Sequence, residues 1–279
     1  MEILSGPFAW LGVGLILMWG LWAVVSAKTL PFAWHARILY TYLRNYHFDS
    51  RPTPLSTDGH WTVFQPTIYT ISTPIGDLDY LLHKSNSTYL ADLDLARGTH
   101  FFCLFRAGLK GSSKRVLPAL GGVTCNWKKE IPPFARVEIW TRVLSWDGKW
   151  IYFISHFVEA DKAKPSRVTD QDVGTPSTGR PQQRPVIYAT SLSKYVIKQG
   201  RKTVPPDEFL VTCGLLPATQ SGSDDALKGT MGSGAQVAWK QIEDQRQKGL
   251  ELANHIAALD AGFDWFPLDG QGEVAFAKY

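Results

Sequence analysis

Asp77-Leu-Asp-Tyr-Leu-Leu-His83-Lys-Ser-Asn86-Ser-Thr-Tyr89-Leu-Ala-Asp-Leu-Asp-Leu-Ala-Arg97 is an acidic turn that runs directly into an amphipathic segment. From Tyr89 to Phe101 apolar residues recur at spacings of three and four, which predicts a helix with one side facing a core. Ser85 or Asn86 can cap its first turn. A carboxylate just before a helix N-terminus faces backbone N–H groups without intrahelical partners, and these can hold a polarised carbonyl oxygen. The stretch therefore predicts a central helix and a site for chemistry on a carbonyl group.

Strand candidates lie on both sides of this helix. They are rich in β-branched and aromatic residues and cover 61–71, 115–127, 135–146, 149–159 and 186–198. Asp147-Gly148 between two of them is a hairpin signal. The order strand, helix, then four strands argues against a doubly wound parallel sheet, because such a sheet alternates strands and helices. We predict an α+β fold in which a mainly antiparallel sheet wraps one long helix.

The order Asp-x-Asp, three residues, His-x-x-Asn, two residues, Tyr, then Ala-Arg resembles the opening motif of hotdog-fold thioesterases of the 4-hydroxybenzoyl-CoA type. With its apolar N-terminus and basic linker, the chain also resembles the thioesterase superfamily member 6 group and fungal thioesterase-like proteins of secondary-metabolite gene clusters. The resemblance implies a hotdog fold, a homodimer or higher oligomer, and hydrolysis of acyl-CoA or of a carrier-bound acyl or polyketide-type thioester. A non-catalytic protein that binds an acyl group or an acyl carrier remains the alternative.

The resemblance also assigns roles to residues of the turn. Asp79 stands at the catalytic position, as general base on water or as nucleophile on the thioester carbon. His83 would orient Asp79 or the thioester carbonyl, and Asn86 would hold the substrate, although a structural histidine and a capping asparagine explain them as well. Leu82 and Ser85 stand where the family commonly has glycine and asparagine.

Substrate binding is expected of Tyr89 and of basic residues that would hold the phosphates of CoA or phosphopantetheine. Lys114 and Arg115 are the first candidates, with Lys110, Lys128 and Lys129 beside them; solvated surface charge is the alternative. No glycine loop of the nucleotide-binding type and no Gly-x-Ser-x-Gly elbow accompanies them.

The composition indicates which classes of partner and cofactor to expect. Hydrophobic residues make up 44% of the chain, enough for a packed core, and a net charge of +4 with dispersed Lys and Arg argues against nucleic acid as a partner. Cys103, Cys125 and Cys213 are widely spaced, which predicts free thiols, and the seven His show no metal-ligand spacing. We expect neither a metal ion nor a cofactor.

Residues 8–27 contain no charge and match the about 20 apolar residues that cross a bilayer as a helix. A cleaved signal peptide is the competing interpretation, since Val25-Ser-Ala27 offers small residues, but no Lys or Arg precedes the segment. Basic residues follow it, which predicts a single-pass membrane protein with a cytosolic body. Residues 30–46 are expected to form an amphipathic helix at the membrane interface.

Three parts are therefore expected along the chain. Residues 1–50 would hold the transmembrane anchor and linker, and 51–216 the thioesterase-like domain, with an exposed polar insertion at 160–184. Residues 217–279 would hold a Gly/Ser-rich linker and a C-terminal helix that docks on the body or on a partner.

Overall fold

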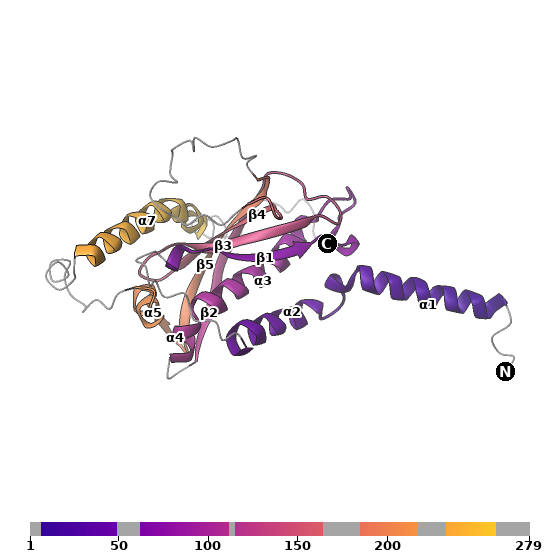
Figure 1. The fold of residues 1–279 in the computed structure, drawn as a ribbon, viewed down its shortest axis with the longest axis horizontal. Helices are drawn as coiled ribbons and strands as arrows, with labels where there is room; N and C mark the ends of the chain where they lie inside the picture. The colour runs from indigo at the N-terminus through magenta and orange to yellow at the C-terminus, as the bar shows by residue number, and fades with distance from the viewer. Residues whose placement is uncertain (1–6, 49–61, 112–114, 164–184, 217–232, 261–279) are drawn as a thin grey trace, which may run out of the picture.

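An antiparallel sheet wrapped around one helix dominates the computed structural model, which describes residues 7–48, 62–111, 115–163, 185–216 and 233–260 (Figure 1). The strand order is β1-β3-β4-β5-β2, with β6 paired to β5, and every pairing is antiparallel. The strands are β1 (Thr67–Ser72), β2 (Val116–Trp127), β3 (Arg136–Trp146), β4 (Ile151–Glu159), β5 (Ile187–Gln199) and β6 (Lys202–Val204).

The central helix, α3 (Asn86–Leu104), lies across one face of this sheet (Figure 1). Its side chains Tyr89 and Leu93 are buried in one cluster with Ile139 of β3 and Phe157 of β4. Each such apolar side chain contributes roughly 1.5–3 kcal/mol by leaving water, so this stripe fixes the helix on the sheet. The predicted α+β hotdog arrangement, a long helix wrapped by an antiparallel sheet, is confirmed.

The beginning of the fold differs from the predicted strand at 61–71. Thr62–Phe64 forms the 3-10 turn η3, and β1 begins only at Thr67. Pro66 lies between them, and proline has no N–H to donate to a strand ladder. Four short elements were not predicted: η4 (Ile75–Asp77), α4 (Arg106–Gly111), β6 and α5 (Pro206–Thr212).

The C-terminal helix α7 (Ser233–Ala257) lies on the face of the sheet opposite α3 (Figure 1). Ala253 and Ile256 are buried against Tyr152 and Leu192 of the sheet. Arg246 donates a hydrogen bond of 2.8 Å to the carbonyl of Trp146. Of the two expected docking modes, the structure thus shows docking on the chain's own body. The expected linker from 217 and most of the insertion at 160–184 lie outside the described residues.

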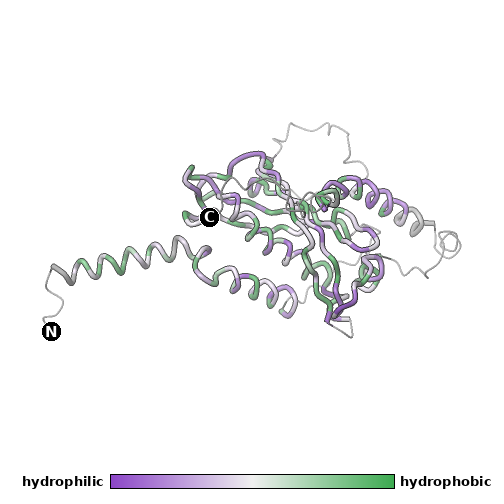
Figure 2. Tube along the Cα trace, turned by 180° about the vertical axis from the view of Figure 1, so that it is seen from behind, coloured by the Kyte–Doolittle hydropathy of each residue, from purple (hydrophilic) through white to green (hydrophobic). Residues whose placement is uncertain are grey.

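The N-terminal helices differ from one another in their surroundings. α1 (Pro7–Val25) projects from the body and its side chains are mostly apolar (Figures 1 and 2). After the short turn η1 (Ala27–Thr29), α2 (Ala33–Tyr42) and its π-helical continuation η2 (Leu43–Phe48) run alongside α3. One side of α2 therefore packs on the protein, where an interfacial helix was expected. Of the helices in the described ranges, none combines the length and apolar character needed to cross a membrane, so the expected transmembrane segment is not supported.

Candidate active site

The acidic turn is a closed loop between β1 and α3. Leu78 and Lys84 form an antiparallel bridge across it, and the N–H of Asp79 donates to the carbonyl of His83 at 2.9 Å. Leu82 at the tip has a φ of 60°. This is the left-handed region, where a Cβ costs roughly 1–2 kcal/mol and glycine costs nothing. Leu82 thus adopts the conformation that the family's glycine would adopt freely.

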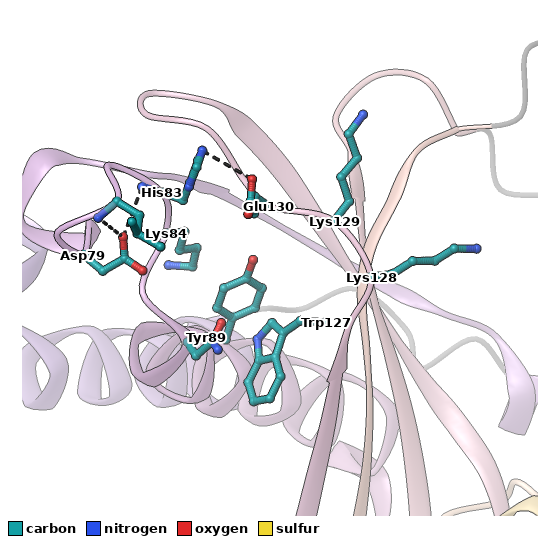
Figure 3. Close-up of a pocket in the computed structure, with 10 residues that line it drawn as sticks. Asp79, His83, Lys84, Tyr89, Trp127, Lys128, Lys129 and Glu130 are labelled. Carbon is teal, nitrogen blue, oxygen red and sulfur yellow. Dashed lines mark hydrogen bonds and ion pairs between the residues drawn. The ribbon is translucent and has the colours of Figure 1, made fainter.

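The Asp79 side chain is held by the backbone of the same loop. Its Oδ1 accepts hydrogen bonds from the N–H of Leu81 at 2.9 Å and of His83 at 3.4 Å. Asp79 is half-buried and lines a hollow of about 510 Å³ (Figure 3). The loop therefore fixes the direction of a carboxylate that still reaches a space large enough for part of a ligand.

The hollow brings together most of the residues that the motif singled out. Asp79, His83, Asn86 and Tyr89 all line it. The end of β2 and the loop after it also line the hollow, with Trp127, Lys128, Lys129 and Glu130. Of these four residues the sequence analysis named only Lys128 and Lys129, as secondary candidates for phosphate binding. Trp127 packs edge-on against Tyr89, with ring centroids 6.1 Å apart. Sequence reasoning missed Trp127 and Glu130 because only the fold brings this loop to the turn.

His83 holds Asp79 through its backbone, while its imidazole turns elsewhere. Nε2 of His83 lies 3.4 Å from Oε2 of Glu130 (Figure 3). Both side chains are substantially exposed, so this pair contributes little to stability. The orienting contact expected between the imidazole and the Asp79 carboxylate is therefore not formed in this structure.

The start of α3 supplies the electrostatic part of the site. Asn86 is the first residue of the helix, and Ser85 before it makes no side-chain capping bond. Of the two predicted capping residues, Ser85 holds the N-cap position without a side-chain cap, and its hydroxyl lies 3.0 Å from that of Ser87. Asn86, the other, lies inside the first turn of the helix. N–H groups in a first helical turn have no intrahelical acceptor and carry partial positive charge, which suits a developing oxyanion. Burial also raises the pKa of the Tyr89 phenol, which keeps it protonated as a donor.

Asp77, the other acid of the pair, is buried and bound by cations. Its carboxylate lies 2.8 Å from the ammonium of Lys84 and also contacts that of Lys28. Because its charge is fully engaged in the interior, Asp77 is a structural residue, and Asp79 is the acid that reaches the hollow.

Of the two basic residues named first for substrate binding, the structure describes only Arg115. Lys114 is outside the described residues. Arg115 directly precedes β2, whereas the hollow lies at the last residue of that strand. A twelve-residue strand is about 40 Å long, so Arg115 does not reach the hollow of its own chain. Lys128 and Lys129 do line the hollow, but their side chains point away from Asp79 (Figure 3).

A long central helix wrapped by an antiparallel sheet defines a hotdog-fold protein, and here a carboxylate lies in the turn before that helix. The chain belongs to the thioesterase-like superfamily, whose family model matches residues 73–212. The predicted resemblance and the predicted class of enzyme, a thioesterase-like hydrolase, are confirmed at this level.

Curated relatives extend the similarity beyond the matched domain. The chain is 33% identical to "Probable thioesterase atnL" of Emericella nidulans, over 85% of this chain and 83% of that one. It is 30% identical to "Thioesterase poxG" of Penicillium oxalicum, over 92% of this chain and 86% of the relative. A shorter match, 38% identical over 29% of this chain and 39% of the other, joins it to "Protein THEM6" of Xenopus laevis.

Solved structures with a similar fold include a probable thioesterase, YbaW, of Escherichia coli, at 14% identity and a TM-score of 0.38, covering 53% of this chain and 96% of that one. A 4-hydroxybenzoyl CoA thioesterase complexed with 4-hydroxybenzoyl CoA is 11% identical, with a TM-score of 0.38, over 53% of this chain and 99% of the other.

Proposed function

We propose that this protein hydrolyses an acyl thioester carried on CoA or on a carrier protein, with Asp79 as its reactive carboxylate. The observation that carries the proposal is that Asp79 and the first residue of α3 line the same hollow. A thioester carbonyl placed there would present its carbon to the carboxylate and its oxygen to the helix N-terminus. The resemblance to secondary-metabolite proteins extends the proposal to polyketide-type acyl groups.

Asp79 could take part in the hydrolysis in two ways. As a nucleophile, its carboxylate attacks the thioester carbon, the thiolate leaves, and water then hydrolyses the mixed anhydride. As a general base, it takes a proton from a water molecule whose oxygen attacks the same carbon, and the thiolate leaves with a proton. Either route consumes one water and yields a carboxylic acid and a thiol. Asn86 and Tyr89 would contact the acyl group or its carrier arm.

The test is release of free thiol from a panel of acyl-CoAs and acyl-carrier proteins by the full chain. Asp79→Asn should lower kcat by about a thousandfold, the usual scale for losing a reacting group. Asp161→Asn is the matched control, since Asp161 is an exposed carboxylate that pairs with exposed Arg136 and is not among the residues that line the hollow. Release that survives Asp79→Asn would overturn the assignment. Binding without release by the wild-type protein would favour the non-catalytic acyl-binding alternative.

We further propose a homodimer formed through β2. This strand ends the sheet, so its outer edge has no partner strand within the described chain, and Leu117 and Leu120 on it are about half exposed. Edge strands of this length readily pair with another chain. Antiparallel pairing of two whole β2 strands would centre between Gly121 and Gly122 and set Arg115 of a second copy opposite Lys128. The proposed phosphate-binding role of Arg115 would then be exerted in the neighbouring subunit's site.

We also propose that α1 associates with a membrane and that the body of the protein lies on the cytosolic side. Trp10, Ile16 and Trp19 on this helix are 71%, 72% and 64% exposed. Such apolar surface on a helix that projects from the body favours insertion into a lipid interface. The full chain should float with phosphatidylcholine vesicles, and replacing Trp10, Trp19 and Trp22 by Ser should abolish flotation. The division at residues 50 and 216 into anchor, thioesterase-like domain and C-terminal part remains part of this proposal.

A further inference from the structure

A closed ring of three buried charges and one partly buried charge lies beneath the candidate turn. Lys28 and Lys84 alternate in it with Asp77 and Asp92. The Lys84 ammonium lies 2.8 Å from Asp77 and 2.9 Å from Asp92, and the Lys28 ammonium lies 2.7 Å from Asp92 and also contacts Asp77. The side chains of Asp77, Lys84 and Asp92 are at most 2% exposed, and that of Lys28 is 14% exposed.

The ring joins segments that are far apart in sequence. Lys28 belongs to η1, directly after α1, whereas Asp77 and Lys84 stand at the two ends of the turn that contains Asp79. Asp92 lies in the second turn of α3. Lys28 also donates a hydrogen bond of 3.1 Å to the carbonyl of Ser72, the last residue of β1. One ammonium therefore contacts the strand before the turn, the turn itself and the helix after it.

Charges in the protein interior remain ionised because oppositely charged partners compensate for the loss of water. Burial lowers the pKa of Lys28, while its attraction to Asp92 and its hydrogen bonds to Asp77 and Asp92 act in the opposite direction. If the Lys28 charge is removed, two buried carboxylates share Lys84, with Arg37 touching only Asp92 at 3.4 Å. Removing one member of a buried ion network leaves a poorly compensated charge, which is strongly destabilising.

We propose that Lys28 is a positioning residue for the candidate active site, because its ammonium fixes Asp77 and thereby the turn that presents Asp79. The carbonyl of Asp77 accepts the N–H of Ser85 at 2.7 Å, and the N–H of Lys84 donates to Ile131 at 3.0 Å. The ring and these backbone bonds together hold both ends of the loop. The segment that follows α1 is thus part of the site's framework, although it precedes the matched family domain.

Hydrogen–deuterium exchange tests the structural half of this proposal without any substrate. In the full-length Lys28→Met variant, amides of residues 77–85 should exchange about tenfold faster, while those of β4 stay unchanged. Lys28→Arg, which keeps the charge, should restore slow exchange. Arg37→Met is the matched control, because it removes a cation that touches Asp92 but not Asp77, and it should leave the turn as in the wild type.

The second readout rests on the proposed function. In thiol release from acyl-CoA, Lys28→Met should lower kcat and leave KM nearly unchanged, and Lys28→Arg should recover most of kcat. If the wild-type protein releases no thiol, the proposed hydrolysis fails while the exchange experiment still decides the role of Lys28. Wild-type exchange in the turn of Lys28→Met, or equal acceleration throughout α3 and β4, would overturn the positioning role.

Discussion

Asp77 and Asp79 are separated by one residue yet have opposite environments. The Asp77 carboxylate is 2% exposed and lies between two ammonium groups, whereas Asp79 accepts backbone N–H groups and lines an open hollow. The alternation comes from the extended backbone of Leu78 between them, which directs neighbouring side chains to opposite sides. Asp77 is thus positioned to hold the loop, and Asp79 is the acid to which the proposed mechanism assigns the reaction.

This difference predicts that the same substitution lowers stability much more at Asp77 than at Asp79. Asp77→Asn leaves Lys28 and Lys84 with only Asp92 as a buried anion and should lower the free energy of unfolding by about 3–5 kcal/mol. Asp79→Asn keeps an acceptor oxygen for the N–H of Leu81, so it should change stability by less than about 1 kcal/mol. Urea unfolding of the two full-length variants measures both values. Equal loss of stability would contradict the separation of roles.

The sequence was sufficient to predict this helix and, from its strand and hairpin signals, the antiparallel sheet. The motif named Asp79, His83, Asn86 and Tyr89, and these four residues line one hollow in the structure. Periodicity and hairpin signals are local, and they placed four of the five predicted strands within two residues of their observed ends. The role of Asp77 could not be predicted, because Lys28 is 49 residues away in sequence and meets it only in the fold. For the same reason the sequence did not point to Glu130 as the partner of His83.

Leu82 provides a test of strain in the turn. Its φ of 60° disfavours a Cβ, and its side chain is 66% exposed, so little packing would be lost with it. Replacing Leu82 by glycine would remove roughly 1–2 kcal/mol of backbone strain, which exceeds the roughly 0.5–1 kcal/mol that glycine costs in conformational entropy. Leu82→Gly should therefore leave the protein as stable as the wild type or up to about 1 kcal/mol more stable.

Leu82→Val is the matched comparison, because a β-branched residue tolerates positive φ least. It should lower the melting temperature while Leu82→Gly does not. A glycine variant that unfolds more easily than the valine variant would show that the leucine side chain stabilises the turn in some other way.

The burial of His100 predicts that the stability of the fold depends on pH. Its ring is fully buried on α3 against Phe153, Nδ1 lies 2.9 Å from the hydroxyl of Thr67, and Nε2 has no partner among the described residues. Burial lowers the pKa of His100 to about 3, from 6.5. Between these two values the unfolded chain binds the proton and the folded protein does not, so stability falls as pH falls through this window.

The slope approaches about 1.4 kcal/mol per pH unit for one group. His100→Gln removes the titration and should flatten the loss of stability between pH 6 and pH 4, as measured by urea unfolding at each pH. His35→Gln, at an exposed position, should keep the wild-type slope. An unchanged slope in His100→Gln would assign the acid sensitivity to other groups.

Gly249 determines how closely α7 approaches the sheet. A Cβ at this position would lie 2.2 Å from the carbonyl oxygen of Leu144, which is backbone and cannot rotate away. Gly249→Ala must therefore push α7 off β3, and overpacking of this kind costs about 1–3 kcal/mol in spite of the better helix propensity of alanine. Gly148→Ala in the β3–β4 turn has no atom within 4 Å of the new Cβ and is the control.

Displacement of α7 should be visible beyond the loss of stability. Two hydrogen bonds that now join the helix to the sheet would be lost. The Arg246 guanidinium donates to the carbonyl of Trp146 at 2.8 Å, and the Ser145 hydroxyl donates to the carbonyl of Arg246 at 2.6 Å. Limited proteolysis should then cleave within α7 sooner in Gly249→Ala than in the wild type, while the thiol release proposed for the hollow at Asp79 should be unchanged. Wild-type proteolysis and stability in Gly249→Ala would mean that α7 is not held against Leu144.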